Sequence, residues 1–190
     1  MKSTDKYNKI IHAAAKVFAK KGFFNARISD IAKEAKVADG TIYLYFSNKF
    51  NILLSVFEQE IGKQIEEVNA LLIAEEDVQE KLNIFIRHHL EAMRKNRALA
   101  EVIYVELRQT NKLIREYRSN KFSEYLDVVA NIITLGQEQG IYRQNIDISL
   151  VKSAIFGALD ETSPIWLVGA NSSAQTAEQF SLFFQNALLQ

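Results

Sequence analysis

The side chains best suited to chemistry lie close together in the stretch VADGTIYLYFSNKF, residues 37–50. The hydroxyl of Thr41 and the free amides of a first helical turn can donate hydrogen bonds to a phosphate. Tyr43 and Tyr45 offer a phenol to a phosphate and a ring edge to a thymine methyl group. Lys49 adds a positive charge shortly afterwards. This combination is suited to contact with double-stranded DNA.

Asp39 and Gly40 precede these groups, and each is expected to have a different role. Gly40 has no side chain, so it lets the backbone come close to a duplex. The carboxylate of Asp39 is repelled by phosphates, but at a base edge it can accept a hydrogen bond from the amino group of cytosine or adenine. It can equally serve as a helix cap, because aspartate is a favoured capping residue. Both interpretations of Asp39 stay open at this point.

Residue patterns that perform catalysis are not found in the sequence. The pair His88-His89 is not the HExxH zinc motif, whose histidines lie four residues apart on one helix face. Asp160 and Glu161 are adjacent, so on a helix they point about 100° apart and make a poor acid–base pair. There is no P-loop, no G-x-S-x-G elbow and no cysteine for a metal site or a disulfide. We therefore expect no enzyme activity, no bound metal and no cofactor.

The composition predicts an all-α chain. Only one proline and seven glycines occur in 190 residues, and strand-like alternation is hard to find. The first helix should end at Gly22, and Pro164 should kink a late helix or end it early. About nine helices are expected: 6–21, 28–35, 39–46, Lys49 into the low 70s, about 77–95, 97–109, 111–139, 147–168 and 174–189. The apolar stripe of the first contains Ile10, Ala14, Val17 and Phe18.

Two of these expected helices form a motif. The helices over 28–35 and 39–46, joined by residues 36–38, fit the helix-turn-helix, in which the second helix enters the major groove while the first crosses the backbone. Ile42 and Phe46 are four residues apart, so both can pack against the preceding helices. The opposite side of the second helix is then left for DNA.

Charge is divided unevenly along a chain whose net charge is zero. Residues 1–50 contain ten Lys/Arg and four Asp/Glu, a net charge of +6, whereas residues 51–190 contain thirteen and nineteen, a net charge of −6. A basic head indicates a polyanionic partner for the head alone, although charges scattered over a solvated surface would give the same counts. We expect a DNA-binding domain at 1–48 and a domain for ligand binding and dimerisation at 49–190. No apolar run is long enough to cross a bilayer and no signal peptide is evident, so we expect no membrane partner and a cytoplasmic location.

The run ISDIAKEAKVADGTIYLYFSNKFNIL, residues 28–53, resembles the DNA-binding segment of the TetR family of bacterial transcriptional repressors. The matching positions are Ile31, Ala32, Ala35, Val37, Gly40, Thr41, Ile42, Tyr43, Tyr45, Phe46, Lys49 and Leu53. The sequence departs from the family pattern at Arg27, at Ala38-Asp39 and at Lys36, which replaces a turn glycine and must adopt a strained conformation or a different turn. The resemblance implies an all-α TetR-like homodimer that reads a pseudo-palindromic operator. The residues expected to contact DNA are Arg27, Ser29, Ala38, Asp39, Gly40, Thr41, Tyr43, Tyr45 and Lys49.

Three segments narrow the resemblance: ADGTIYLYF at 38–46, ELRQTN at 106–111 and FGALDET at 156–162. They are similar to the FadR-type regulators of fatty-acid degradation from Bacillus-like bacteria. This likeness implies repression of genes for fatty-acid breakdown and release from DNA on binding a long-chain acyl-CoA. The alternatives are a repressor that senses an unrelated lipophile or drug, as in efflux control, and an acyl-CoA thioesterase-like enzyme.

An acyl chain needs an apolar cavity with a few polar anchors. Most aromatic residues after position 50 should belong to the core, but some must line this cavity. The expected ligand-binding residues are Phe57, Ile61, Phe85, His89, Tyr104, Leu107, Arg108, Tyr125 and Phe156. The cations that could bind the phosphates of the acyl-CoA are Arg87, Arg94, Lys95, Arg97 and Arg108. Of these, Arg108 is the expected phosphate anchor. The other interpretation is that Glu91, Glu101 and Glu106 neutralise these cations as ordinary helix pairs.

The last two helices carry wide apolar faces suited to self-association. Four such helices from two subunits would form an isologous bundle and hold two DNA-binding heads at a fixed separation. The competing interpretation is that the same faces pack within one subunit. The residues expected in the dimer interface are Leu150, Ala154, Ala158, Phe180, Phe183, Phe184 and Leu188.

Overall fold

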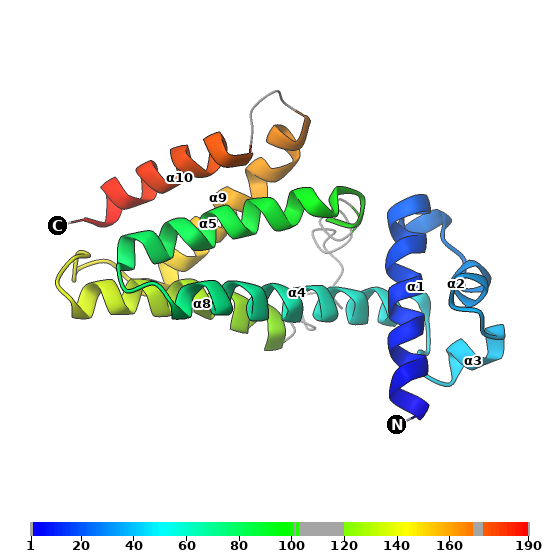
Figure 1. Cartoon of the computed structure of the whole chain (residues 1–190). Coiled ribbons are helices and arrows are strands. Elements are labelled where there is room, and N and C mark those ends of the chain that lie inside the picture. The colour runs from blue at the N-terminus through cyan, green and yellow to red at the C-terminus, as the bar shows by residue number, and fades with distance from the viewer. Residues whose placement is uncertain (1, 101, 103–119, 169–172, 190) are drawn as a thin grey trace. The chain divides into compact units, whose positions relative to one another are not determined.

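The computed structural model describes the chain except for residues 1, 101, 103–119, 169–172 and 190. The described residues are helical nearly throughout, with one isolated β-bridge between Tyr142 and Leu189 (Figure 1). The all-α prediction is confirmed. The helices are α1 (Lys2–Asn25), α2 (Ile28–Ala35), α3 (Asp39–Tyr43), α4 (Lys49–Ile73), α5 (Val78–Lys95), α8 (Asn120–Glu138), α9 (Ile148–Val168) and α10 (Ser173–Leu188).

Several observed helix ends differ from those expected; α1 begins at Lys2 and not at residue 6, and the helix predicted over 39–46 ends at Tyr43. Gly22 interrupts α1 as a kink with φ of 72°, but the helix resumes and ends at Asn25. Helix α9 continues past Pro164 to Val168, so the proline does not end the helix early, and the alternative expectation of a kink there stays a prediction. The helix expected over 97–109 lies mostly outside the described residues, although residues 97–100 are helical. Within the described residues, no helix has the length and apolarity to cross a membrane.

The chain forms two compact units: Met1–Glu60 with Asn96–Arg118, called unit 1, and Ile61–Lys95 with Ser119–Gln190, called unit 2. The division falls inside α4, whereas the predicted domain boundary lies at its first residue. A continuous helix shows no loop or composition change at such a division, so the sequence had no signal for it. The functional division at residue 48 stays a prediction.

The core of unit 1 is built from the predicted stripe of α1. Ile10, Ala14, Val17 and Phe18 are all buried, and they pack in one cluster with residues of α2 and α3. From those two helices the cluster receives Ile31, Ala32 and Ile42, and from the segment after α3 it receives Phe46. This apolar cluster holds α2 and α3 in the helix-turn-helix arrangement.

Of the two alternatives expected at Lys36, a strained conformation or a different turn, the structure has the strained conformation. Lys36 adopts the left-handed conformation, with φ of 56° and ψ of 45°, and it is the only described non-glycine residue with a positive φ. Its backbone N–H and that of Val37 donate to the carbonyls of Lys33 and Ala32, at 3.2 and 3.0 Å. A side chain in this conformation costs about 1–2 kcal/mol, which a glycine would avoid.

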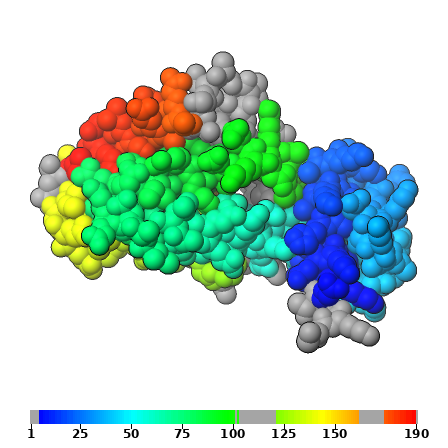
Figure 2. Space-filling view, in the orientation of Figure 1, coloured from blue at the N-terminus to red at the C-terminus, as the bar shows by residue number. Residues whose placement is uncertain are grey.

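The core of unit 2 is formed by α5, which packs against α8, α9 and α10. Along the face seen in Figure 2, α5 and α10 lie side by side. Tyr142 is buried among these helices, and its hydroxyl lies 3.3 Å from the Val78 carbonyl and 3.1 Å from Oε1 of Gln185. A Cβ on Gly136 would overlap the Tyr142 ring, so only glycine permits this close approach of α8.

Candidate nucleic-acid interface and effector site

Helix α3 has one buried side and one exposed side. Ile42 and Phe46 lie in the core of unit 1, at 0% and 4% exposure, whereas Tyr43 and Leu44 are 57% and 81% exposed. Asp39 and Gly40 are exposed as well. An exposed phenol beside an exposed leucine has no role in packing, and Leu44 was not singled out in the sequence. Tyr43 and Leu44 are therefore available to a partner.

Tyr45 occupies a different environment from Tyr43. Its side chain is half-buried and lies against the ring of Tyr7, with a centroid distance of 6.3 Å, and against Phe46 at 6.5 Å. Much of its ring area thus stabilises the scaffold. Helix α3 ends at Tyr43 and Tyr45 lies beyond it, so helix periodicity could not settle which of the two tyrosines faces outward.

Lys49 was expected to supply a cation to the DNA backbone, and the structure engages its charge elsewhere. Nζ donates hydrogen bonds to the carbonyls of Phe23, Phe24 and Ala26, at 2.7, 3.2 and 2.9 Å, and lies 4.5 Å from the centroid of the Phe23 ring. An ammonium group has three donors, and all three are used. Lys49 therefore caps the carboxyl end of α1 and fixes the start of α4 to it.

One interpretation of Asp39 was that it caps the helix, but Asp39 is not the N-cap residue of α3. The N-cap position of α3 is Ala38, and Asp39 is the first helical residue, where a negative charge favours the helix dipole. Within the described part of the chain its carboxylate has no hydrogen-bond partner. It is exposed, as are Ala38, Arg27 and Ser29.

The first turn of α2 is anchored by Asp30. Its carboxylate accepts the backbone N–H of Arg27 at 3.0 Å and pairs with Lys21 at 2.7 Å. The Lys21 hydrogen bond, followed by that of the Arg27 backbone, holds the pKa of Asp30 below its usual value. Arg27, at which the sequence departs from the family pattern, is the N-cap residue of α2. The substitution at Arg27 is thus accommodated by an acid three residues later.

In unit 2 the structure brings four of the expected ligand-binding residues into one aromatic cluster. Phe85 and His89 on α5 meet Tyr125 on α8 and Phe156 on α9, with ring centroids 5.3–6.5 Å apart. Phe122 adds an edge-to-face contact with Phe156 at 5.1 Å. These rings form a largely apolar environment with a single imidazole inside.

The remaining expected ligand-binding residues are dispersed or undescribed. Phe57 is half-buried and belongs to unit 1, whereas Ile61 packs against the core of unit 2. Tyr104, Leu107 and Arg108 lie outside the described residues. The phosphate anchor predicted at Arg108 therefore stays a prediction.

His89 is the polar group of the aromatic cluster. Its Nδ1 lies 2.8 Å from the Tyr125 hydroxyl, and the ring is 5% exposed. Nε2 is buried without a hydrogen-bond partner in the described part of the molecule. Burial, with a smaller effect from His88, lowers the pKa of His89 to about 4, and burial raises the pKa of the Tyr125 hydroxyl. Both groups are neutral near pH 7.

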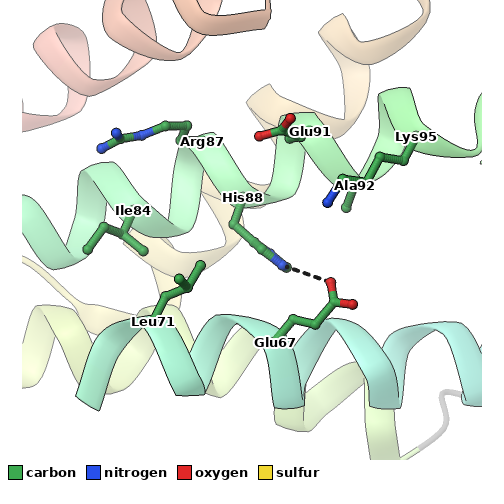
Figure 3. A pocket seen from close by; sticks show the side chains of 8 residues that line it. All are labelled: Glu67, Leu71, Ile84, Arg87, His88, Glu91, Ala92 and Lys95. Atoms are coloured by element: carbon green, nitrogen blue, oxygen red, sulfur yellow. Dashed lines mark hydrogen bonds and ion pairs between the residues drawn. The ribbon is translucent and has the colours of Figure 1, made fainter. Parts of the chain in front are cut away.

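A separate pocket of about 300 Å³ lies between α4 and α5 (Figure 3). His88 points from α5 toward Glu67 on α4, and Nε2 lies 3.4 Å from a carboxylate oxygen. Burial lowers the pKa of His88, against the opposing effect of Glu67. Glu67 and His88 are 21 positions apart and share no motif, so the sequence could not predict this contact. The pocket is lined by Glu67, Leu71, Ile84, Arg87, His88, Glu91, Ala92 and Lys95.

Several cations near this pocket are paired within unit 2. Arg94 pairs with Glu91 at 3.6 Å, as the helix-pair interpretation expected, and Arg87 pairs with Glu80 at 2.8 Å. These pairs are largely exposed, so they contribute little to stability. Arg87 and Lys95 both line the pocket, and the charge of Arg87 is paired with Glu80.

The residues expected in the dimer interface divide into two groups. Phe184 and Leu188 are buried in the core of unit 2, and Phe180 and Ala158 are partly buried against it. For these, packing within one subunit is what the structure shows. Leu150 and Phe183 are 67% and 65% exposed, Ala154 is exposed, and Leu182, which the sequence analysis missed, is 57% exposed.

A helix-turn-helix whose second helix leaves Tyr43 and Leu44 open to solvent defines a DNA-binding regulator. Residues 10–56 match the family model of the bacterial regulatory proteins of the tetR family, and residues 57–179 match that of the YsiA-like protein C-terminal region. The chain belongs to the TetR family.

Known relatives agree with this assignment along nearly the whole chain. The chain is 38% identical over 163 residues to the fatty acid metabolism regulator protein of Bacillus subtilis, which covers 86% of this chain and 84% of that protein. It is similar in structure to the fatty acid degradation regulator FadR from Bacillus halodurans, with a TM-score of 0.86, 34% identity and coverage of 95% and 94%. It is also similar to the transcriptional regulator FadR from B. subtilis in complex with stearoyl-CoA, with a TM-score of 0.86, 34% identity and coverage of 94% and 97%. The predicted resemblance to TetR and FadR-type regulators is confirmed.

Proposed function

We propose that this TetR-family regulator is a homodimeric repressor, located in the cytoplasm with its DNA, that leaves its operator on binding a long-chain acyl-CoA. The observation that carries the proposal is the similarity, over most of the chain, to a fatty acid metabolism regulator and to a regulator bound to stearoyl-CoA. The buried aromatic cluster of unit 2 supports an apolar ligand, and the exposed side of α3 supports a DNA contact.

Two heads are needed for an operator to be distinguished from other DNA. One five-residue helix such as α3 buries too little surface for this alone, and a dimer reads two half-sites about one helical turn apart. Exposed apolar side chains on α9 and α10 favour a partner subunit there, because apolar patches of this kind are usually covered. These side chains are Leu150, Leu182 and Phe183.

Release from DNA follows if the effector binds one shape of the protein more tightly than another. Helix α5 contributes to the aromatic cluster through His89, and its neighbour His88 contacts Glu67 on α4. Helix α4 is continuous from Glu67 back to Lys49, which is bonded to the carboxyl end of α1. A movement of α5 can therefore be transmitted to the helix-turn-helix through the His88–Glu67 contact, the backbone of α4 and the hydrogen bonds of Lys49.

The test is a gel shift with the protein, its selected operator and stearoyl-CoA. The operator is first obtained by selection from random duplexes, which should return a sequence with approximate twofold symmetry. Stearoyl-CoA should then abolish the shifted band, while coenzyme A alone should leave it unchanged. An unchanged band at saturating stearoyl-CoA would show that the effector assignment is wrong.

The alternative of an unrelated lipophile is separated by native mass spectrometry of the protein purified from cells. A co-purifying mass that matches an acyl-CoA supports the proposal, and any other bound mass identifies the alternative effector. A thioesterase would release free coenzyme A from stearoyl-CoA during the same incubation. We expect no such release, because the hydroxyl–base pair of the aromatic cluster, Tyr125 with His89, uses a phenol whose pKa is raised by burial and which is therefore a poor nucleophile.

A further inference from the structure

The imidazole of His89 leaves one nitrogen unsatisfied in the interior of unit 2. Nδ1 is bonded to the Tyr125 hydroxyl, whereas Nε2 has no partner among the described residues although the side chain is almost completely buried. Buried polar atoms are nearly always hydrogen-bonded in folded proteins, so an exception requires an explanation. We propose that the Nε2–H of His89 donates a hydrogen bond to the thioester carbonyl oxygen of the bound acyl-CoA. This inference rests on the proposed function and adds the recognising atom to it.

The hydrogen-bond inventory fixes which nitrogen carries the proton. His89 is the only partner of the Tyr125 hydroxyl in the described residues. If Tyr125 donates to Nδ1, the only unsatisfied group is Nε2–H. If Nδ1–H donates to Tyr125 instead, both the phenolic hydrogen and Nε2 are left without partners. The first arrangement leaves fewer buried groups unpaired, and the partner on one nitrogen sets the tautomer of the other.

The surroundings of His89 favour a neutral acceptor over an anion. Phe85, Tyr125 and Phe156 surround the ring with aromatic carbon, and the only charge effect on its pKa comes from His88. Because burial keeps the imidazole neutral near pH 7, it offers a donor but no positive charge. A carboxylate in such a site would lack a counter-charge, whereas a thioester carbonyl needs only one donor. The cluster is therefore expected to distinguish an acyl thioester from a free fatty acid.

The decisive comparison uses two ligands that differ in one oxygen. Stearoyl-CoA has the thioester carbonyl, and S-octadecyl-CoA is a thioether without it. Titration calorimetry should show that the unmodified protein binds stearoyl-CoA roughly tenfold more tightly than the thioether, the size expected for losing the partner of a buried donor. Equal affinities would overturn the inference and indicate that a water molecule satisfies Nε2.

Two substitutions separate the roles of the two nitrogens. In His89→Asn the side-chain oxygen can still accept from Tyr125, but no donor is left at the Nε2 position, so the preference for the thioester should fall to about onefold. In His89→Gln the amide nitrogen can take the place of Nε2, so a preference of at least roughly threefold should remain. An unchanged preference in His89→Asn would contradict the proposal.

The neighbouring histidine supplies a matched control. His88 lies on the same helix, but its ring faces Glu67, and His88→Asn should keep the preference for the thioester. Loss of the preference in this control would mean that it reflects the packing of α5 and not the Nε2 donor. All three variants are compared with the unmodified protein by circular dichroism, so that an unfolded protein is not counted.

Failure of the proposed function gives a different result. In that case neither CoA ligand binds the unmodified protein, while the protein still shifts its operator. Binding of both CoA ligands with equal affinity overturns only the role of His89. Stearate is the third ligand to be titrated, and it should bind at least roughly tenfold more weakly than stearoyl-CoA. Tighter binding of stearate would contradict the assignment of a neutral carbonyl as the partner of Nε2.

Discussion

Unit 1 carries its candidate functional groups on its surface, whereas unit 2 carries its candidate functional groups inside its core. In unit 1 the groups suited to DNA contact, Tyr43 above all, stand outside an apolar cluster whose described members include no histidine. In unit 2 the two polar residues that are buried among the described ones, His89 and Gln185, lie inside the core. An outward-facing site leaves a linear motif because consecutive positions of one short helix carry it. An inward-facing site is assembled from α5, α8 and α9, and so leaves none.

The largest effect that this comparison predicts is on operator affinity. Tyr43→Ala should weaken operator binding by about 100-fold in a dimer that loses the contact twice, because each base or phosphate contact contributes about 1–3 kcal/mol. Its free energy of unfolding should change by no more than about 0.5 kcal/mol, since the side chain is exposed. Fluorescence anisotropy with a labelled operator and urea denaturation measure the two quantities.

Lys49→Met should act on stability instead. The variant leaves the carbonyls of Phe23, Phe24 and Ala26 without their charged donor, so unfolding should become easier by about 2 kcal/mol. Because its charge is held by these carbonyls, the dependence of operator affinity on salt should keep its slope. A slope reduced by one phosphate contact, with stability unchanged, would restore the phosphate role expected from the sequence.

The buried histidine of unit 2 should make stability depend on pH. The pKa of His89 is lowered to about 4, so between pH 6.5 and 4 the unfolded chain binds a proton that the folded chain does not. Its contribution is fully present above pH 6.5 and is lost as the pH falls, by about 2 kcal/mol at pH 5. His88 acts in the same direction. Urea denaturation at pH 7, 6 and 5 measures the effect, and His89→Phe should reduce the slope.

The smallest predicted effect is at the turn of the helix-turn-helix. Lys36→Gly relieves the left-handed strain and should raise the free energy of unfolding by about 1 kcal/mol, offset in part by the greater entropy of a glycine in the unfolded chain. Lys36→Ala removes the same charge and keeps the strain, so it is the control. A gain of the same size in both variants would mean that charge, not backbone conformation, sets the cost.

Much of unit 1 was predictable from local sequence. The stripe of α1 and the division of α3 into the buried Ile42 and the exposed Tyr43 follow from spacing over a few residues, and the left-handed Lys36 is one of the two alternatives that the family resemblance implied. The role of Lys49 did not, because its partners lie 23 to 26 positions earlier in the chain. Nothing in its neighbourhood distinguishes a lysine that binds carbonyls from one that binds a phosphate.

For unit 2 the sequence predicted the helices and the supply of aromatic residues, but not their partners. Four expected ligand-binding residues do meet, yet the bond between His89 and Tyr125 joins positions 36 apart, and the contact between His88 and Glu67 joins positions 21 apart. The same limit applies to the apolar faces of α9 and α10. Spacing alone could not divide them into the buried Phe184 and the exposed Phe183.

By itself the sequence determined the class of fold, the helix-turn-helix and the family, because helix periodicity, turn chemistry and a motif at fixed spacing are local properties of the chain. Only the tertiary structure decided that the ammonium group of Lys49 in unit 1 is already hydrogen-bonded and that Nε2 of His89 in unit 2 is not, within the described part of the chain. Burial and hydrogen-bond satisfaction depend on every element packed around a group, and segments distant in the chain provide most of those neighbours.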